Sequence, residues 1–487
     1  MTAEAGAARL LARELVEDLR AADHRALGFQ GVDLAGALEQ QLFFAIRDGR
    51  RPAGGTARDL AASAGAWLRP LAAAGVGLMA WRLPKPGRAP MVVLVREPTH
   101  YAVLAQVEAE LQAVAGETLA LLRVGRAAAA APPHAVAPRL AELMEPGLAT
   151  RALGHHRLTR RALRVAVAVW RGRVDARRAA ELFEIASVES GRIALGAAAL
   201  LSAARCWRPA LLAGFDEIGT LARLLPEVAR SAGVPSLDLP HAEAADASAI
   251  QGASYDCMAT YGPRATAVLR AAGVPAERIV EIGAPRLDPL VRLVAEGRPA
   301  GEDRQVLFAA QYVAGAMTFD VMRSCYRAAL AAARAIGASE VVVVPHPAEE
   351  PGTAARVMAP AGPVDLPVRV SNAGLHLELT RSRLLVTGWS NAVFEAAVAG
   401  IPAIAVNPGG VAPVDFAADG LAVGASDEAS AARAAASLRD EETMRAMVER
   451  ARAVATQRLG PLDGRASERA ARLMLSLARG EPRRSAA

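Results

Sequence analysis

Short apolar runs alternate with amphipathic segments along most of the chain. Between residues 89 and 295 the apolar runs are MVVLV, TLALLRV, PALLAGF and SLDL. Between residues 303 and 480 they are QVLFAAQ, VVVVP, LPVRV, RLLVTGW and PAIAV. Strands that alternate with helices indicate parallel βαβ units. The pattern therefore predicts an α/β fold of two Rossmann-like domains that face each other across a cleft, one at 89–295 and one at 303–480.

Two further stretches carry helical periodicity without such strands. Residues 1–88 contain LARELVEDLRAADHRALGF and LAGALEQQLFFAIRDG and end in the basic, proline-containing segment RLPKPGRAP. We predict that they form a helical leader followed by a linker. Helical patterning also dominates residues 138–204, which we predict to be a helical insert in the first domain.

A histidine follows the most apolar run of the second domain. VVVVPHP places His346 and Pro347 directly after the strand. Proline cannot donate to a strand ladder, so the strand ends there, and proline also biases His346 towards an extended conformation. The imidazole would then be held in one place, with an N–H available to a phosphate oxygen. A histidine that only caps a strand end is the structural alternative.

The segment TGWSNAVFEAAVAGIP predicts a strand end, a tight turn and a helix. Gly388 allows a close approach of another backbone or side chain, and Ser390 and Asn391 lie where the helix starts. A helix start suits a phosphate because its backbone N–H groups are unpaired and its dipole end is positive. Simple N-capping is the alternative. Glu395, four to five positions into the helix, could face a ribose or sugar hydroxyl. With His346 on a neighbouring strand, the sequence predicts one diphosphate-binding edge.

The first domain offers its own polar strand ends. Asp216 and Glu217 follow PALLAGF, and a carboxylate there could serve as a general base if burial raised its pKa. An acidic pair that stabilises a helix N-terminus is the alternative. His241 follows SLDLP and could accept a proton across the cleft. His100, after MVVLV, is a further candidate, and Arg96 beside it could meet a negative group. We interpret the remaining histidines as surface residues: His24, His134, His155, His156 and His376.

The turn GAPRLD ends the first domain. Arg286 in this turn could bind the acceptor or lock a hinge between the domains. A structural clamp between Arg286 and Asp288 is the interpretation that we favour for this turn.

Composition narrows the class of protein. The chain has 487 residues, a net charge of +6 and three cysteines without a CxxC pair, which is typical of a reducing cytoplasm. The sequence lacks HExxH, GxGxxG, GxxxxGK[ST] and GxSxG patterns, so we expect no metal and no cofactor. It has no Cys/His finger or aromatic-interleaved basic stripe, so we expect no nucleic-acid partner. There is neither a signal-peptide pattern nor a run of about 20 apolar residues. We expect a cytoplasmic protein, with peripheral contact to the inner membrane face left open.

Ordered motifs in residues 205–430 resemble those of a known group. The motifs are the strand-end His241, D-x-x-x-x-x-G at Asp256–Gly262, G-x-P-R-x-D at Gly283–Asp288, the HP pair, and S-x-x-x-x-E-A-x-x-x-G-x-P at Ser390–Pro402. This order resembles bacterial GT-B transferases that build surface polymers: CDP-glycerol glycerophosphotransferases, the capsule Kdo-transferase type and bacterial sialyltransferases with an HP motif. The resemblance implies that His346 and Ser390 contact the nucleotide phosphates in a donor domain. It also implies that an acceptor-domain residue, His241 or Asp216, is the base.

Three functions remain open from the sequence. The leading hypothesis is a metal-independent GT-B transferase that moves a sugar or alditol phosphate from a nucleotide-activated donor to a surface-polysaccharide, glycan or lipid-linked acceptor. The first alternative is a non-hydrolysing UDP-N-acetylglucosamine 2-epimerase. Such an enzyme should carry acidic residues and an arginine at the edge of the first domain, and Asp216, Glu217 and Arg96 could be those residues. The second is a catalytically degenerate GT-B protein that only binds.

Overall fold

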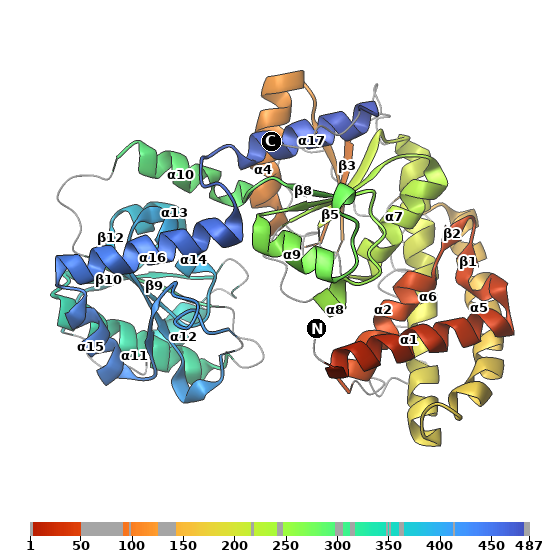
Figure 1. The fold of residues 1–487 in the computed structure, drawn as a ribbon, viewed down its shortest axis with the longest axis horizontal. Helices are drawn as coiled ribbons and strands as arrows, with labels where there is room; N and C mark the ends of the chain where they lie inside the picture. The colour runs from red at the N-terminus through yellow and green to blue at the C-terminus, as the bar shows by residue number, and fades with distance from the viewer. Residues whose placement is uncertain are drawn as a thin grey trace. The chain divides into compact units, whose positions relative to one another are not determined.

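The computed structural model describes residues 3–49, 91–96, 99–124, 143–215, 219–240, 247–297, 305–311, 317–346, 349, 352–359, 365–412 and 414–481. The chain forms two compact units, which are drawn in Figure 1. The N-terminal unit comprises Met1–Thr260, Ala265–Glu281 and Glu468–Ala487. The C-terminal unit comprises Tyr261–Arg264 and Ile282–Ser467.

The N-terminal unit contains a parallel six-stranded sheet of order β4-β3-β5-β6-β7-β8. Its central strands are short and mostly apolar, and all of their residues are buried, as expected for a parallel sheet covered on both faces. From β3 the chain adds β4 on one side and then returns to add β5 on the other side. The topological switch point, where the order of strands reverses, therefore lies between β3 and β5. The strands are β3 (Met91–Val95), β4 (Leu119–Arg123), β5 (Leu211–Phe215), β6 (Ser236–Leu239), β7 (Cys257–Thr260) and β8 (Ile279–Glu281). The helices near this sheet are α4 (Thr99–Ala115), α7 (Thr220–Ala232), α8 (Ala247–Ile250), α9 (Pro263–Ala271), η5 (Ala276–Arg278) and α17 (Ala466–Arg479).

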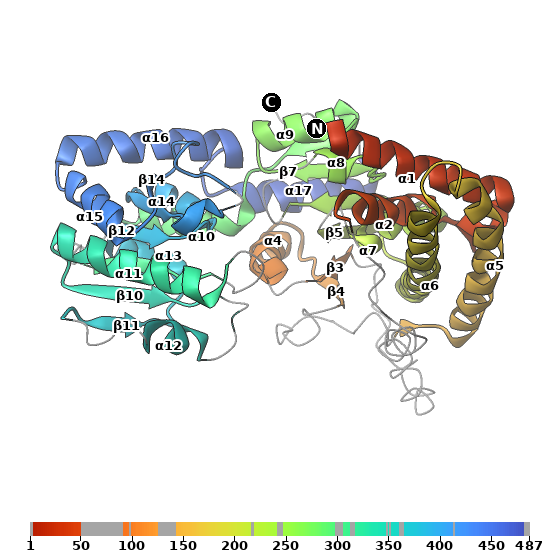
Figure 2. The ribbon, with the colours of Figure 1, turned by 90° about the horizontal axis from the view of Figure 1, so that it is seen from below.

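A helical layer completes the N-terminal unit. It consists of α1 (Ala3–Ala22), η1 (His24–Leu27), the β1–β2 hairpin (Gly28–Phe29 and Val32–Asp33), α2 (Ala35–Arg47), α5 (Pro146–Trp170) and α6 (Ala176–Trp207). α6 lies at its centre, between α5 and α7 (Figure 2). Gly196 permits this close packing, since a Cβ there would lie 2.9 Å from Leu221 Cδ2 of α7. Among the described helices, α6 alone is long and apolar enough to cross a membrane, but 72% of its apolar window is buried inside the unit.

The C-terminal unit has a second parallel six-stranded sheet, of order β11-β10-β9-β12-β13-β14. In chain order this is 3-2-1-4-5-6, the order of dinucleotide-binding Rossmann sheets. The strands are β9 (Gln305–Ala309), β10 (Glu340–Val344), β11 (Val368–Val370), β12 (Ser382–Thr387), β13 (Ala403–Val406) and β14 (Val423–Ala425). The two sheets confirm the predicted α/β fold with two Rossmann-like halves.

Helices cover both faces of the C-terminal sheet. In β10, Val341 and Val343 join a core with α11 and α15, whereas Val342 and Val344 join a core with α14 and α16. This alternation explains why the strand reads as four consecutive valines. The helices are η6 (Pro285–Leu287), α10 (Asp288–Ala295), α11 (Phe319–Ile336), α12 (Thr353–Met358), α13 (Leu375–Thr380), α14 (Ala392–Ala399), η8 (Pro408–Gly410), α15 (Glu428–Ser437) and α16 (Glu441–Leu459).

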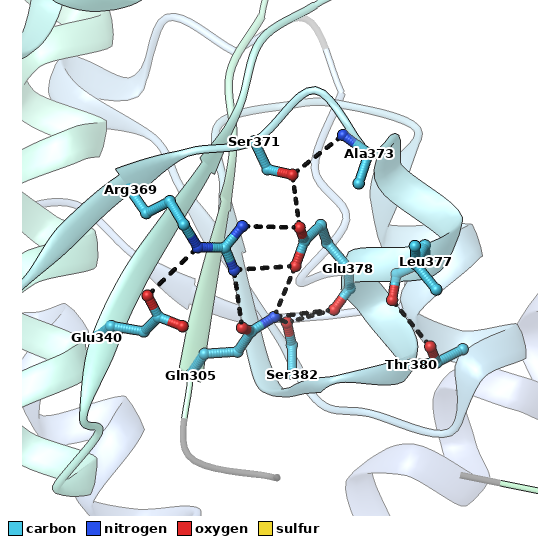
Figure 3. Close-up of polar contacts among 9 residues, drawn as sticks. All are labelled: Gln305, Glu340, Arg369, Ser371, Ala373, Leu377, Glu378, Thr380 and Ser382. Atoms are coloured by element: carbon cyan, nitrogen blue, oxygen red, sulfur yellow. Dashed lines mark hydrogen bonds and ion pairs between the residues drawn. The ribbon is translucent and has the colours of Figure 1, made fainter. Parts of the chain in front are cut away.

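A buried carboxylate links three strands of this sheet to α13 (Figure 3). Glu378 of α13 is fully buried and accepts hydrogen bonds from Arg369 Nη1 at 3.0 Å, Gln305 Nε2 at 3.1 Å and the Ser371 hydroxyl. Gln305 also donates to Ser382 Oγ at 2.9 Å. Because these residues come from β9, β12, α13, β11 and, directly after β11, Ser371, the network ties three strands of the sheet to α13.

Candidate functional site

The predicted polar turns of the C-terminal unit lie on both sides of the sheet's switch point. Ala309 of β9 pairs with Val344 of β10 on one side and with Thr387 of β12 on the other, so the three strands end at the same level. His346 follows β10 by two residues, and the turn to α14 follows β12 directly. We expected these two strands to be neighbours, but that prediction is wrong because β9 lies between them. Two strand spacings separate them by about 9–10 Å, and ligands of Rossmann sheets bind at such switch points.

Gln311, two residues beyond β9, links the end of β9 to the turn after β12. Its Oε1 accepts a hydrogen bond from the backbone N–H of Trp389 at 2.8 Å. Thr387 Oγ1 adds a second link by donating to the carbonyl of Ala309 at 2.8 Å. A Cβ at Gly388 would overlap Gln311 Oε1 and would lie 2.9 Å from Met317 Cε. The close approach expected at Gly388 is therefore made by the Gln311 side chain, which our sequence reasoning missed although it directly follows a predicted strand.

The start of α14 combines a hydroxyl, an exposed amide and a helix N-terminus. Ser390 Oγ accepts a hydrogen bond from the backbone N–H of Ala392 at 3.2 Å, which is the local capping that we gave as the alternative. Asn391 has helical backbone angles, is exposed, and makes no side-chain cap bond. Helix N–H groups and the positive dipole end therefore lie beside two polar side chains, an arrangement that can accept an anion.

His346 lies half-buried at the end of β10. Burial disfavours the imidazolium and lowers the pKa of His346 below its usual 6.5. At neutral pH the ring is therefore uncharged, with one N–H donor and one acceptor nitrogen. Its carbonyl accepts a hydrogen bond from the backbone N–H of Glu349 at 2.9 Å. Pro347 lies outside the described residues.

Glu395 and Arg286 form a buried ion pair within the C-terminal unit. Glu395 is 4% exposed, and its Oε2 has no hydrogen-bond partner among the described residues. Burial disfavours the charge of Arg286, but the carboxylate of Glu395 and the hydroxyl of Tyr261 outweigh it and raise the pKa of Arg286. Asp288 instead accepts the backbone N–H groups of Ala466 and Ser467 at 3.2 and 2.7 Å. The Arg286–Asp288 clamp that we expected is therefore wrong.

His376 belongs to the same cluster, although we interpreted it as a surface residue. It lies half-buried in α13, close enough to Arg286 and Glu395 to interact with both electrostatically. Burial is the main reason that the pKa of His376 is lowered. No local signal in the sequence distinguishes this histidine, because its charged neighbours come from distant segments.

The switch point of the N-terminal sheet is packed by an aromatic stack. His100 is 1% exposed, and its ring stacks on Phe215 of β5, with centroids 4.5 Å apart. Its Nδ1 accepts a hydrogen bond from the backbone N–H of Arg96 at 3.4 Å. The structure thus brings Arg96 and His100 together at the carboxyl end of β3, where His100 joins β3 to β5.

The three candidate catalytic residues lie outside the described residues. Asp216 and Glu217 directly follow β5 in the chain, and His241 comes two residues after β6. β5 and β6 are neighbours in the sheet. Across the part of the chain that the structure describes, no group of three or more His, Cys, Asp or Glu side chains could hold a metal ion.

No protein-family model matches this chain, and no curated protein matches it. Solved structures do share its fold. MnaA of S. aureus in a co-structure with UDP has a TM-score of 0.51 at 14% identity, and the match covers 81% of this chain and 99% of that one. A putative UDP-N-acetylglucosamine 2-epimerase from Listeria monocytogenes has a TM-score of 0.50 at 12% identity, covering 82% and 99%. UDP-GlcNAc 2-epimerase from Neisseria meningitidis, bound to UDP-GlcNAc, has a TM-score of 0.50 at 11% identity, covering 79% and 100%. The chain is similar to these structures over most of its length, and its fold is the two-domain GT-B type.

Proposed function

We propose that this protein is a metal-independent GT-B transferase that acts on a nucleotide-activated donor. It would move a sugar or an alditol phosphate to a surface-polysaccharide or glycoconjugate acceptor. The observation that carries the proposal is the C-terminal unit's Rossmann strand order, with His346 on one side of the switch point and the Ser390 turn on the other.

The donor's diphosphate would bind across these two turns. Negative charge builds on the leaving phosphate as the bond to the transferred group breaks. The α14 N-terminus and the neutral His346 imidazole can stabilise that charge without a metal, because their dipoles are fixed before the reaction. Gln311 would keep the β12 turn in place through its bond to Trp389.

Glu395 would contribute through its second carboxylate oxygen. Oε1 is held by Arg286, whereas Oε2 has no hydrogen-bond partner among the described residues. A buried acceptor without a partner is costly, and a ribose or sugar hydroxyl could supply the missing donor. The Arg286 ion pair would then orient Glu395 for the ligand, in place of the hinge role that the sequence suggested.

The N-terminal unit would supply the base that removes the acceptor hydroxyl proton. His241 and Asp216 are the candidates, with Glu217 beside the latter, because they follow the adjacent strands β5 and β6. Arg96 would meet a negative group of the acceptor, which in this proposal is a glycan or lipid-linked molecule.

The similar structures support a nucleotide-sugar ligand as part of the proposal. One is a co-structure with UDP, and another is bound to UDP-GlcNAc. We place the protein in the cytoplasm, where its three cysteines would remain reduced; each of them is free.

The test is donor turnover by the purified full chain. The protein is incubated with CMP-, CDP-, UDP- and GDP-linked compounds, with and without a polysaccharide or lipid-linked acceptor, and the released nucleotide is quantified by chromatography. The proposal expects nucleotide release that depends on the acceptor. Conversion of UDP-N-acetylglucosamine alone would establish the epimerase alternative, and binding without turnover would establish a binding protein.

A further inference from the structure

Helix α5 has one face packed in the N-terminal unit and the other exposed. Figures 1 and 2 show it at the outside of the unit, against α1 and α6. Its inner face is apolar and fully buried at Leu148, Leu163 and Trp170. Trp170 Nε1 also donates to the carbonyl of Leu15 at 3.2 Å, which fastens the helix to α1. The orientation of α5 is therefore fixed, and so is the identity of its outer face.

The outer face carries large apolar side chains in water. Leu153 is 41% exposed, Val165 is 61% exposed and Val169 is 52% exposed. Of the eight large hydrophobic residues that are exposed in the described part of the chain, these three lie on one helix. At about 100° per residue they fall within one arc of about 160°, so they form a stripe along one side of α5.

Arginines share this arc with the apolar side chains. Arg157, Arg161 and Arg164 are exposed and project from the same side of the helix. Residues 146–173 contain seven arginines and no aspartate or glutamate. Within the described part of the chain, no carboxylate forms an ion pair with any of these three arginines.

Nearby exposed arginines on α6 behave differently. Arg177 pairs with Glu181, and Arg192 pairs with Glu189. At the end of α6, Arg205 pairs with Glu145. Unpaired positive charge therefore distinguishes the outer face of α5 from the neighbouring helix α6.

We propose that the outer face of α5 binds an anionic phospholipid surface. A helix lying in the membrane interface needs apolar side chains to enter the headgroup boundary and basic side chains to meet lipid phosphates. Leu153, Val165 and Val169 supply the apolar side chains, and Arg157, Arg161 and Arg164 supply the basic ones. A nucleic acid would use the arginines but would leave exposed valines in water, and this face carries no aromatic side chain for base stacking. The inference does not depend on the proposed transferase activity.

The test is co-sedimentation of the full chain with lipid vesicles. One set of vesicles contains only phosphatidylcholine, and the other contains about 30% phosphatidylglycerol. The first variant is Arg157→Gln/Arg161→Gln/Arg164→Gln, and the second is Val165→Ser/Val169→Ser. The control, Arg177→Gln/Arg192→Gln/Arg205→Gln, removes the same net charge from exposed arginines that are paired. Circular dichroism and the thermal midpoint show that each variant is folded.

The wild type should bind the anionic vesicles and not the neutral ones. Each interfacial arginine contributes about five-fold to partitioning, so the α5 triple variant should bind about 100-fold more weakly. The control should bind like the wild type, and the valine variant should bind more weakly with an unchanged salt dependence. Absence of binding to anionic vesicles, an equal loss in the control, or tighter binding to a 30-nucleotide single strand than to vesicles would each overturn the proposal.

Discussion

Replacing Glu378 by glutamine should destabilise the C-terminal unit in a pH-dependent way. Burial alone raises the pKa of this carboxyl, but hydrogen bonds from Arg369, Ser371 and Gln305 outweigh burial and lower the pKa of Glu378 from 4.5 to about 2. Glutamine keeps the size of the side chain and removes the charge, so the variant isolates the electrostatic part of the network.

The expected loss of stability in Glu378→Gln follows from the lowered pKa of Glu378. At about 1.4 kcal/mol for each pKa unit, a change from 4.5 to about 2 stabilises the charged form by about 3.5 kcal/mol. Arg369 is 44% exposed, so solvent screens part of this attraction and the expected loss is about 2 kcal/mol at pH 7. A carboxyl with a lowered folded-state pKa stabilises the fold above its unfolded-state pKa. The contribution of Glu378 should therefore disappear as the pH falls from about 4.5 to about 2.

The assay is urea unfolding followed by the fluorescence of Trp389, the single tryptophan of the C-terminal unit. Background from the other tryptophans is removed by their replacement with phenylalanine in both proteins. The Glu428→Gln variant is the control, because Glu428 and its partner Arg327 are each more than half exposed. An equal difference between wild type and Glu378→Gln at pH 7 and pH 2.5, or a loss no larger than that of the control, would refute the reasoning.

Three further predictions concern the candidate site. Arg286→Met should lower the free energy of unfolding in urea by about 3–5 kcal/mol, because it leaves Glu395 buried and unpaired. The double variant Arg286→Met/Glu395→Leu should recover most of that loss, and an equal loss in the single and the double variant would contradict the ion pair. Gly388→Ala should lower the free energy of unfolding by about 1–3 kcal/mol, because the new methyl group displaces the Gln311 side chain. Adding Gln311→Ala should recover part of that loss, whereas strictly additive losses would show that the two residues do not interact. The pKa of His346 measured by NMR titration should lie below 6.5, because the ring is partly buried. The free energy of unfolding should therefore fall as the pH drops from 6.5 to that pKa. A measured pKa above 6.5 would contradict the burial of the ring.

Local sequence patterns carried the prediction of the fold. The four valines of β10 predict a strand buried on both faces, and the structure shows why, since they alternate between two cores. Glycine and polar residues after such strands then indicate which turns could bind a ligand. These features were accessible because they depend on residues that are close in sequence.

Pairings between distant segments could not be predicted in this way. The sequence neighbour Asp288 looked like the partner of Arg286, but the partner is Glu395, 109 residues away. The order of strands is equally non-local, so β9 was not expected between β10 and β12. The burial of His376 and the Gln311–Trp389 bond depend on the same long-range arrangement.

The proposed function depends most directly on diphosphate binding at the switch point of the C-terminal sheet. Isothermal titration calorimetry with UDP and CDP tests it on the wild type, on His346→Ala, and on His24→Ala, which removes an exposed histidine of the N-terminal unit. At least one nucleotide should bind the wild type and His24→Ala equally. His346→Ala should bind it about ten-fold more weakly, the loss of about one hydrogen bond to a charged oxygen. Equal affinity of His346→Ala and wild type, or no binding of either nucleotide, would contradict the account.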